Sequence, residues 1–198
     1  SVEEGAPKYV PEGTGWVTAE YSMLPRANRE RTRRDISRLK LSPRSAEIQR
    51  LVGRSLRAAV DMEALGDRTV TIDCDVLQGD GGTRTASVTG GFIALALACR
   101  KLLEQGKVAK DPIRRYVAAV SAGIVDDRLL LDLCYSEDSR AMVDFNCVMD
   151  DGGGLIELQG TGEGRSFTLA EQRELVELCQ GGIFQLMEKQ KEILGGHR

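Results

Sequence analysis

The stretch from Thr69 to Leu103 constrains this chain most, because a strand pattern, a glycine-rich turn and a helix pattern follow one another without interruption. Three glycines in the turn let the backbone bend tightly and bring N–H groups close to a ligand. The helix that follows points its positive end at the same place. Arg84 in its first turn is electrostatically unfavourable there unless an anion is bound. We therefore expect a phosphate shared by Thr83, Arg84 and the backbone amides.

The glycine turn does not match the common nucleotide-binding motifs. A Walker loop requires Gly-Lys-Ser/Thr, and a dinucleotide-binding fingerprint requires a third glycine where Arg84 stands. Taken alone, the turn therefore fits a tight structural turn nearly as well as an anion site.

Hydrophobic periodicity predicts an α+β fold, with helices layered on a mixed sheet. Strands are expected at 15–24, 69–78, 116–125, 128–135, 141–149 and 155–159, and helices at 45–66, at 86–103 and from 168 onward. Residues 1–4 carry no strand or helix pattern. Thr168 and Glu171 form a capping box at the start of the last helix. With 198 residues, 41% of them hydrophobic, we expect a single domain over 1–198.

The composition excludes several kinds of chemistry. The five cysteines are widely spaced without a C-x-x-C pair, which favours buried thiols in a reducing compartment over a metal cage or a disulfide framework. His197 is the single histidine and stands near the end of the sequence, so imidazole catalysis is not expected. No apolar run approaches the length of a membrane span, and no basic-then-apolar leader is present. We expect a cytoplasmic protein with no membrane contact.

Positive charge is concentrated in one segment. Eleven basic and three acidic residues between Arg26 and Arg57 give a net charge of +8, whereas the rest of the chain carries −11. This asymmetry indicates a polyanionic partner bound at one place. Residues 26–43 show no apolar period and are interpreted as a mobile basic loop. A solvated loop without a ligand is the alternative interpretation.

Asp138 and Asp144 are candidate metal ligands. They lie six residues apart, and an even separation on an extended chain would place both carboxylates on one face, as a hard divalent ion with retained waters requires. Spacing alone does not select this pair, because other acidic residues would serve similarly: Asp126, Asp127, Asp132, Asp150 and Asp151.

Arg44 stands just before the expected helix at 45–66. Arginine suits bidentate contacts with phosphate. Trp16 and Tyr21 could stack a nucleic-acid base, although both fit positions in the core as well.

Four segments together resemble the ribonuclease PH family: residues 15–26 (GWVTAEYSMLPR), 44–51 (RSAEIQRL), 80–87 (DGGTRTAS) and 157–161 (ELQGT). The resemblance covers essentially the whole chain. It implies a fold like the second domain of ribosomal protein S5 and a hexameric ring built as a trimer of dimers. The sequence starts inside the family pattern, so we expect it to be N-terminally incomplete, lacking the family's opening strands.

The resemblance also implies an activity. The family are phosphorolytic 3′-5′ exoribonucleases, or tRNA nucleotidyltransferases, which trim the 3′ end of precursor tRNA and act on other RNA 3′ ends. They attack the terminal linkage with inorganic phosphate as co-substrate and release nucleoside 5′-diphosphates. Magnesium is the implied cofactor.

Carried over position by position, the resemblance assigns residues to three tasks. Phosphate binding falls on Arg44, Gly82, Thr83 and Arg84. Catalysis and the magnesium ion fall on Asp138 and Asp144. RNA binding by the basic loop falls on Arg26, Arg29, Arg31, Arg33, Arg34 and Arg38. Cys134 stands where the family often carries aspartate or another polar residue, and we expect this difference to be tolerated.

Two other functions are compatible with parts of this pattern. A catalytically inactive RNA-binding ring subunit would share the fold and the basic loop, but it would have no chemical need for Arg44, Arg84, Asp138 and Asp144 together. Metal-dependent hydrolysis would use the carboxylates but would leave the phosphate site unexplained.

Overall fold

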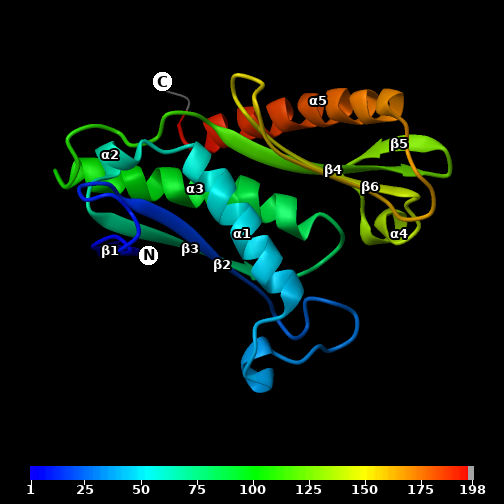
Figure 1. The fold of residues 1–198 in the computed structure, drawn as a ribbon, viewed down its shortest axis with the longest axis horizontal. Helices are drawn as coiled ribbons and strands as arrows, with labels where there is room; N and C mark the ends of the chain where they lie inside the picture. The colour runs from blue at the N-terminus through cyan, green and yellow to red at the C-terminus, as the bar shows by residue number, and fades with distance from the viewer. Residues whose placement is uncertain (196–198) are drawn as a thin grey trace.

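The computed structural model describes residues 1–195, with the side chains of Ile36 and Arg38 left out of the description. Two sheets and three long helices form four layers (Figure 1). α1 (Pro43–Ala58) and α3 (Thr83–Glu104) lie between the sheets, and α5 (Leu169–Ile193) covers the outer face of the second sheet. The α+β class expected from the sequence is confirmed.

The first sheet has the order β1-β3-β2. β2 (Trp16–Met23) runs parallel to β3 (Arg68–Val76), and β1 (Val2–Glu4) pairs antiparallel with the start of β3. Alternate residues of β2 and β3 point to α1 and α3, so Val17, Val70 and Ile72 enter the central core. Because β3 leads directly into the glycine turn and α3, this sheet places the start of α3.

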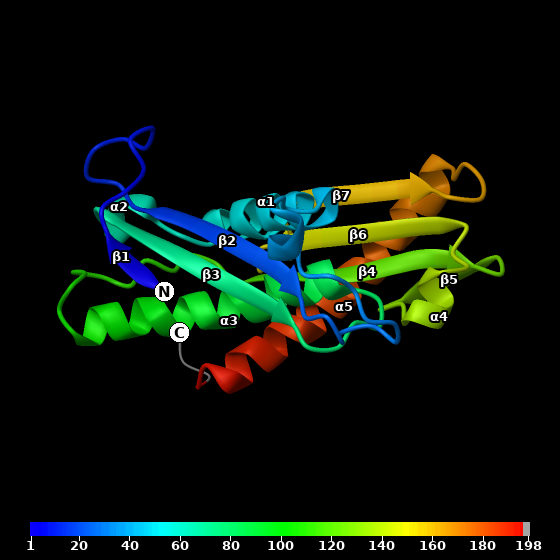
Figure 2. The same ribbon diagram turned by 90° about the horizontal axis from the view of Figure 1, so that it is seen from below.

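The second sheet is antiparallel throughout, in the order β5-β4-β6-β7 (Figure 2). Its strands are β4 (Val117–Val125), β5 (Arg128–Leu131), β6 (Val143–Asp150) and β7 (Leu155–Gly162). One face of β4 and β6 packs on α5 and the other meets the α1–α3 layer. Every residue of β4 is therefore buried.

The expected mixed sheet is present as the first sheet, and a second, antiparallel sheet accompanies it. Two expectations about the elements were wrong. Residues 2–4 do form a strand, because pairing with β3 stabilises it although its own residues are exposed. The helix expected at 45–66 is interrupted: Val60 forms a β-bridge with Ile113, and the Asp61 side chain caps a separate short helix, α2 (Met62–Leu65).

The segment after β5 also differs from the sequence expectation. Residues Tyr135–Asp138 form the short helix α4 instead of continuing a strand, and the Glu137 carboxylate accepts a hydrogen bond of 3.1 Å from the Cys134 N–H at its start. Asp138 thus lies in a helix while Asp144 lies in β6. The chain between Asp138 and Asp144 is not extended, so the expectation that an extended chain places both carboxylates on one face was wrong.

Both predicted hairpins are confirmed. Asp126 and Asp127 connect β4 to β5 with positive φ angles of 49° and 56°, a left-handed turn that aspartate tolerates without glycine. Residues 151–154 connect β6 to β7. The capping box of Thr168 and Glu171 opens α5 as expected.

α3 is long and apolar enough, by length and composition alone, to cross a membrane, with a hydropathy of 1.4, contrary to the expectation that no run approaches a span. Its apolar residues Val88, Phe92 and Leu95 are fully buried between the two sheets. One side of α3 therefore packs in the core, while 33% of its apolar window is buried in all.

Two adjacent glycines in α3 test this packing. A side chain at Gly90 would meet nothing within 4 Å, whereas a Cβ at Gly91 would lie 3.3 Å from Ile72 Cγ2 and 3.4 Å from Leu56 Cδ1. We expect Gly90→Ala to stabilise the protein by about 0.5–1 kcal/mol through helix propensity. Gly91→Val should destabilise it by about 1–3 kcal/mol through overpacking. Urea unfolding of both variants measures the difference, and equal stability of the two would contradict the packing described.

Candidate active site

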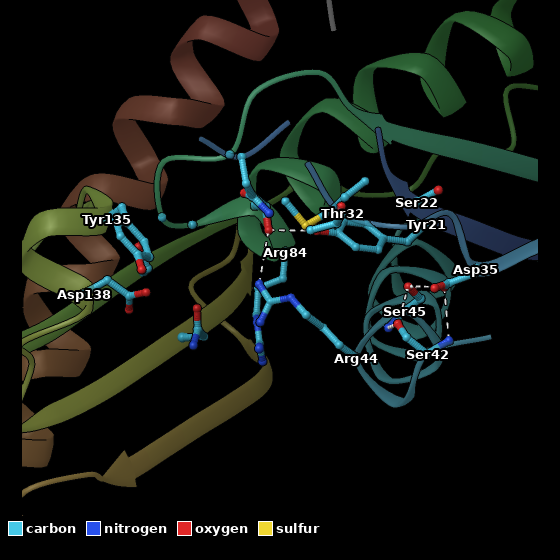
Figure 3. A pocket seen from close by; sticks show the side chains of 18 of the residues that line it. Tyr21, Ser22, Thr32, Asp35, Ser42, Arg44, Ser45, Arg84, Tyr135 and Asp138 are labelled. Atoms are coloured by element: carbon cyan, nitrogen blue, oxygen red, sulfur yellow. Dashed lines mark hydrogen bonds between the residues drawn. The ribbon is translucent and has the colours of Figure 1, made fainter. Parts of the chain in front are cut away.

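A polar cavity of about 470 Å³ lies where the starts of α1 and α3 meet the second sheet (Figure 3). The end of β2, the basic loop, α4 and strands β4 and β6 complete its wall. The structure brings together all the residues expected to bind phosphate or support catalysis: Arg44, Gly82, Thr83, Arg84, Asp138 and Asp144. They come from four separate parts of the chain.

The glycine turn shapes one side of the cavity. Gly81 and Gly82 have φ angles of 77° and 56°, and a Cβ at Gly81 would lie 2.2 Å from the Leu133 carbonyl oxygen, so a side chain there is excluded. Gly82 is the N-cap residue of α3 and supplies no capping side chain. The first N–H groups of α3 have no acceptor within the helix and are available to an anion.

Thr83 is held by two neighbours. Its Oγ1 lies 2.9 Å from Tyr21 Oη, and Arg44 Nη2 donates to the same oxygen over 3.5 Å (Figure 3). Tyr21 is only 2% exposed, so it cannot stack a base and instead orients Thr83. Trp16 packs under the Arg57 guanidinium and does not line the cavity.

Arg84 is fixed by contacts from both halves of the chain. Its Nη1 donates to Gln159 Oε1 at 3.0 Å and lies 3.4 Å from Glu47 Oε2, and Gln159 Nε2 donates to Glu47 Oε1 at 3.2 Å. Glu157 receives two hydrogen bonds from Arg54 on α1. Segments 44–51 and 157–161 thus supply Glu47 and Gln159, which hold the Arg84 guanidinium at the start of α3.

The surroundings of Asp144 disfavour the charged form of its carboxyl group. Burial raises the pKa of its carboxyl group, the charge of Asp138 raises it further, and Arg84 and a 3.2 Å hydrogen bond from Asn146 Nδ2 oppose the shift. No group of three or more His, Cys, Asp or Glu side chains forms a metal cage within residues 1–195. Magnesium needs no such cage, because it uses one or two carboxylates together with substrate phosphates and water. Asp138 and Asp144 fit an open site of that kind.

The basic loop borders this cavity. Of the six arginines assigned to RNA, Arg33 lines the cavity. Four others are exposed: Arg26, Arg29, Arg31 and Arg34. The side chain of Arg38 lies outside the described residues, as does His197. The loop contains one turn of 3-10 helix, η1 (Asp35–Arg38), and the Asp35 carboxylate accepts hydrogen bonds from the Ser42 N–H and the Ser45 hydroxyl at the start of α1.

Three residues of the site were not found by sequence reasoning. Ser121 and Asn146 line the cavity from β4 and β6, where they are paired in register, and Gln159 holds Arg84 from β7. The available signal was a polar residue inside an otherwise apolar strand, as in VAAVSAGIV around Ser121.

Comparison with known proteins decides the family. The models of the 3′ exoribonuclease family match residues 1–101 with domain 1 and residues 115–181 with domain 2. The chain belongs to the RNase PH family. The ribonuclease PH proteins of Bacillus mycoides (strain KBAB4) and Bacillus cereus (strain B4264) are 56% and 54% identical over 197 residues, which is 98% of this chain and 80% of each relative. This family of enzymes is phosphorolytic, so inorganic phosphate is the co-substrate and the exoribonuclease is a nucleotidyltransferase.

Solved structures show the same fold at much lower identity. An Archaeoglobus fulgidus exosome structure with RNA bound to the active site superposes with a TM-score of 0.73 at 22% identity, covering 95% of this chain and 76% of that one. Rice Rrp46 superposes with a TM-score of 0.72 at 13% identity, covering 98% and 79%. The resemblance stated from the sequence is thereby confirmed, including its α+β fold.

The setting of Asp144 yields a stability prediction. Because its pKa is raised in the folded state, the native protein binds more protons than the unfolded chain, and wild-type stability falls as pH rises through that pKa. Asp144→Asn keeps the acceptor for Asn146 but removes the charge. Without magnesium, its melting temperature should exceed that of the wild type at neutral pH, by about 2–4 °C for each kcal/mol gained.

The difference should shrink in acid, where the wild-type carboxyl group is protonated. The exposed Asp73→Asn is the control and should leave the melting temperature unchanged. Calorimetry at a series of pH values measures both variants, and a lower melting temperature for Asp144→Asn at neutral pH would refute the explanation.

Proposed function

We propose that this chain trims the 3′ end of precursor tRNA, using inorganic phosphate and releasing nucleoside 5′-diphosphates. The observation that carries the proposal is the cavity itself, in which Arg44 lies beside the uncapped N-terminus of α3 and its first residues, Thr83 and Arg84, with two carboxylates in the same wall. The proposal assigns phosphate to Arg44, Gly82, Thr83 and Arg84.

The chemistry requires position and charge more than a protein nucleophile. An oxygen of inorganic phosphate attacks the phosphorus of the terminal linkage, and the bond from that phosphorus to the 3′ oxygen of the preceding nucleotide breaks. The attacking phosphate becomes the β-phosphate of the released diphosphate, and the shortened RNA keeps a 3′ hydroxyl after taking up a proton. Arginine and backbone N–H donors hold both phosphates in line and offset their mutual repulsion.

Asp138 and Asp144 are proposed to hold magnesium. The two carboxylates would bind the ion with substrate oxygens and water as its remaining ligands. The ion supplies neutralisation of charge on the reacting phosphates. Asn146 orients the Asp144 carboxylate through its amide, and Arg84 limits the local negative charge.

The RNA strand is proposed to approach across the basic loop. The loop and α1 carry most of the +8 charge of segment 26–57, and arginines there suit backbone phosphates. We propose further that the chain works in the cytoplasm in a hexameric ring, a trimer of dimers, as the family resemblance implies. The exosome structures with the same fold are compatible with ring assembly.

Arg84 provides a test of how the work is divided. Arg84→Gln keeps a polar side chain beside Gln159 and Glu47 but removes the charge that faces phosphate. We expect the KM for phosphate to rise about 10- to 100-fold, as loss of a charge-assisted hydrogen bond implies. The RNA dissociation constant should stay within about twofold of wild type.

Arg173→Gln, an exposed arginine on α5, is the matched control and should change neither value. Steady-state kinetics with varied phosphate measures the KM for phosphate, and RNA binding without phosphate measures the RNA dissociation constant. Equal loss of both would contradict the proposed division.

The basic loop should act on RNA and not on phosphate. Replacing Arg29, Arg31 and Arg34 by Gln should weaken RNA binding and flatten its salt dependence, by about 0.7 in the log–log slope for each lost contact with single-stranded RNA. The rate at saturating RNA should remain near wild type, because these side chains do not line the cavity. An unchanged salt slope would favour the solvated-loop interpretation.

The phosphate requirement tests the function as a whole. In magnesium, release of nucleotides from the RNA 3′ end should rise with inorganic phosphate and saturate. Release that is independent of phosphate would indicate metal-dependent hydrolysis. Tight RNA binding without turnover at saturating phosphate would indicate the inactive ring subunit.

A further inference from the structure

Ser121 is a buried polar residue whose hydroxyl has no hydrogen-bond partner within the described part of the chain. It lies in the middle of β4, is 4% exposed, and its Oγ makes no hydrogen bond to any described residue. Among the described residues, three other buried side-chain atoms also lack a hydrogen-bond partner, and they belong to Ser55, Arg68 and Gln190. None of these three residues lines the cavity. Ser121 does line it.

The hydroxyl of Ser121 is directed at the glycine turn. A Cβ built on Gly82 would lie 3.4 Å from Ser121 Oγ and 3.4 Å from Thr85 Oγ1. The Thr85 hydroxyl donates to the Gly82 carbonyl oxygen at 2.8 Å, so its one donor hydrogen is used. Ser121 remains a donor without an acceptor beside the N-cap of α3.

The surroundings of Ser121 carry groups that suit an anion, beside one carboxylate: Asp132 Oδ1 lies 3.9 Å from the Cβ built on Gly82. The uncapped N–H groups of α3 lie on one side, and Arg84 and Asn146 line the same cavity. Asn146 is opposite Ser121 in the β4–β6 register, and its amide is already turned toward Asp144. A buried hydroxyl without a partner is rare in folded proteins, and an acceptor that binds from outside removes its cost.

We propose that Ser121 is a further phosphate-binding residue, which donates its hydroxyl hydrogen to an oxygen of the attacking phosphate. The proposal rests on the phosphate site of the proposed function and adds a contact from the second sheet. Arg44 and Thr83 approach from α1 and α3, so Ser121 holds the phosphate from β4. A donor there restricts rotation of the phosphate and favours the in-line orientation.

Substitution separates this role from simple filling of space. Ser121→Ala removes the donor, and Ser121→Cys keeps the shape of the side chain at a slightly larger volume but offers only a weak S–H donor. Ser55→Ala is the matched control, because Ser55 is a fully buried serine on α1 with an equally unpartnered hydroxyl outside the cavity.

Phosphate binding is measured first without RNA, as the rise in the melting temperature of the chain when inorganic phosphate is added. The reference is the melting temperature in a buffer that contains neither phosphate nor sulfate. We expect Ser121→Ala and Ser121→Cys to need about tenfold more phosphate than wild type for the same rise, the loss expected for one hydrogen bond to a charged group. Ser55→Ala should match wild type. In buffer alone, both Ser121 variants should melt no lower than wild type, since an unpartnered group is removed.

Kinetics gives the second measurement. The KM for phosphate should rise by the same factor in both Ser121 variants, with the KM for RNA unchanged. Two results would overturn the inference and leave the proposed function intact. One is a phosphate affinity of the Ser121 variants equal to that of wild type, and the other is an equal loss of RNA and phosphate affinity in these variants. A wild-type protein that responds to phosphate in neither assay would overturn both.

Discussion

The uncapped N-terminus of α3 is the constraint on which the site depends. A 22-residue helix begins at Thr83 after a left-handed glycine, with no side chain capping it and an arginine in its first turn. An anion is the natural partner for this arrangement. In the structure, Arg84 is held by Glu47 of α1 and Gln159 of β7. The positions of α1 and of the second sheet are therefore tied to the same guanidinium.

The two sheets contribute different chemistry to one cavity. The first sheet and its helices supply the groups that suit phosphate, because β3 delivers the glycine turn and α1 delivers Arg44. The second sheet supplies Asp144, Asn146 and Ser121. The same face of this sheet is apolar further along, where Ala119 and Val148 pack in the central core. The site is thus the polar end of the layer between the sheets, where the central core opens to solvent.

The sequence predicted the parts that depend on local chemistry. The glycine turn, the Asp126–Asp127 hairpin and the capping box at Thr168 need only neighbouring residues, and all three are present. Asp138 and Asp144 were chosen through family resemblance, since the extended chain assumed between them does not exist. Gln159 contacts Arg84, 75 residues away in sequence, and Ser121 lies beside Gly82, and periodicity reveals neither relation. Of the two roles open to Tyr21, the core position is confirmed, and its hydroxyl meets Thr83.

In the proposed function, the anion that binds at the N-terminus of α3 is itself the attacking group. The most direct measurement is degradation of RNA in magnesium and 18O-labelled inorganic phosphate, followed by mass spectrometry of the released nucleotides. The released nucleotides should be nucleoside diphosphates whose β-phosphate carries the label. Nucleoside monophosphates that carry oxygen from water would contradict the proposed function.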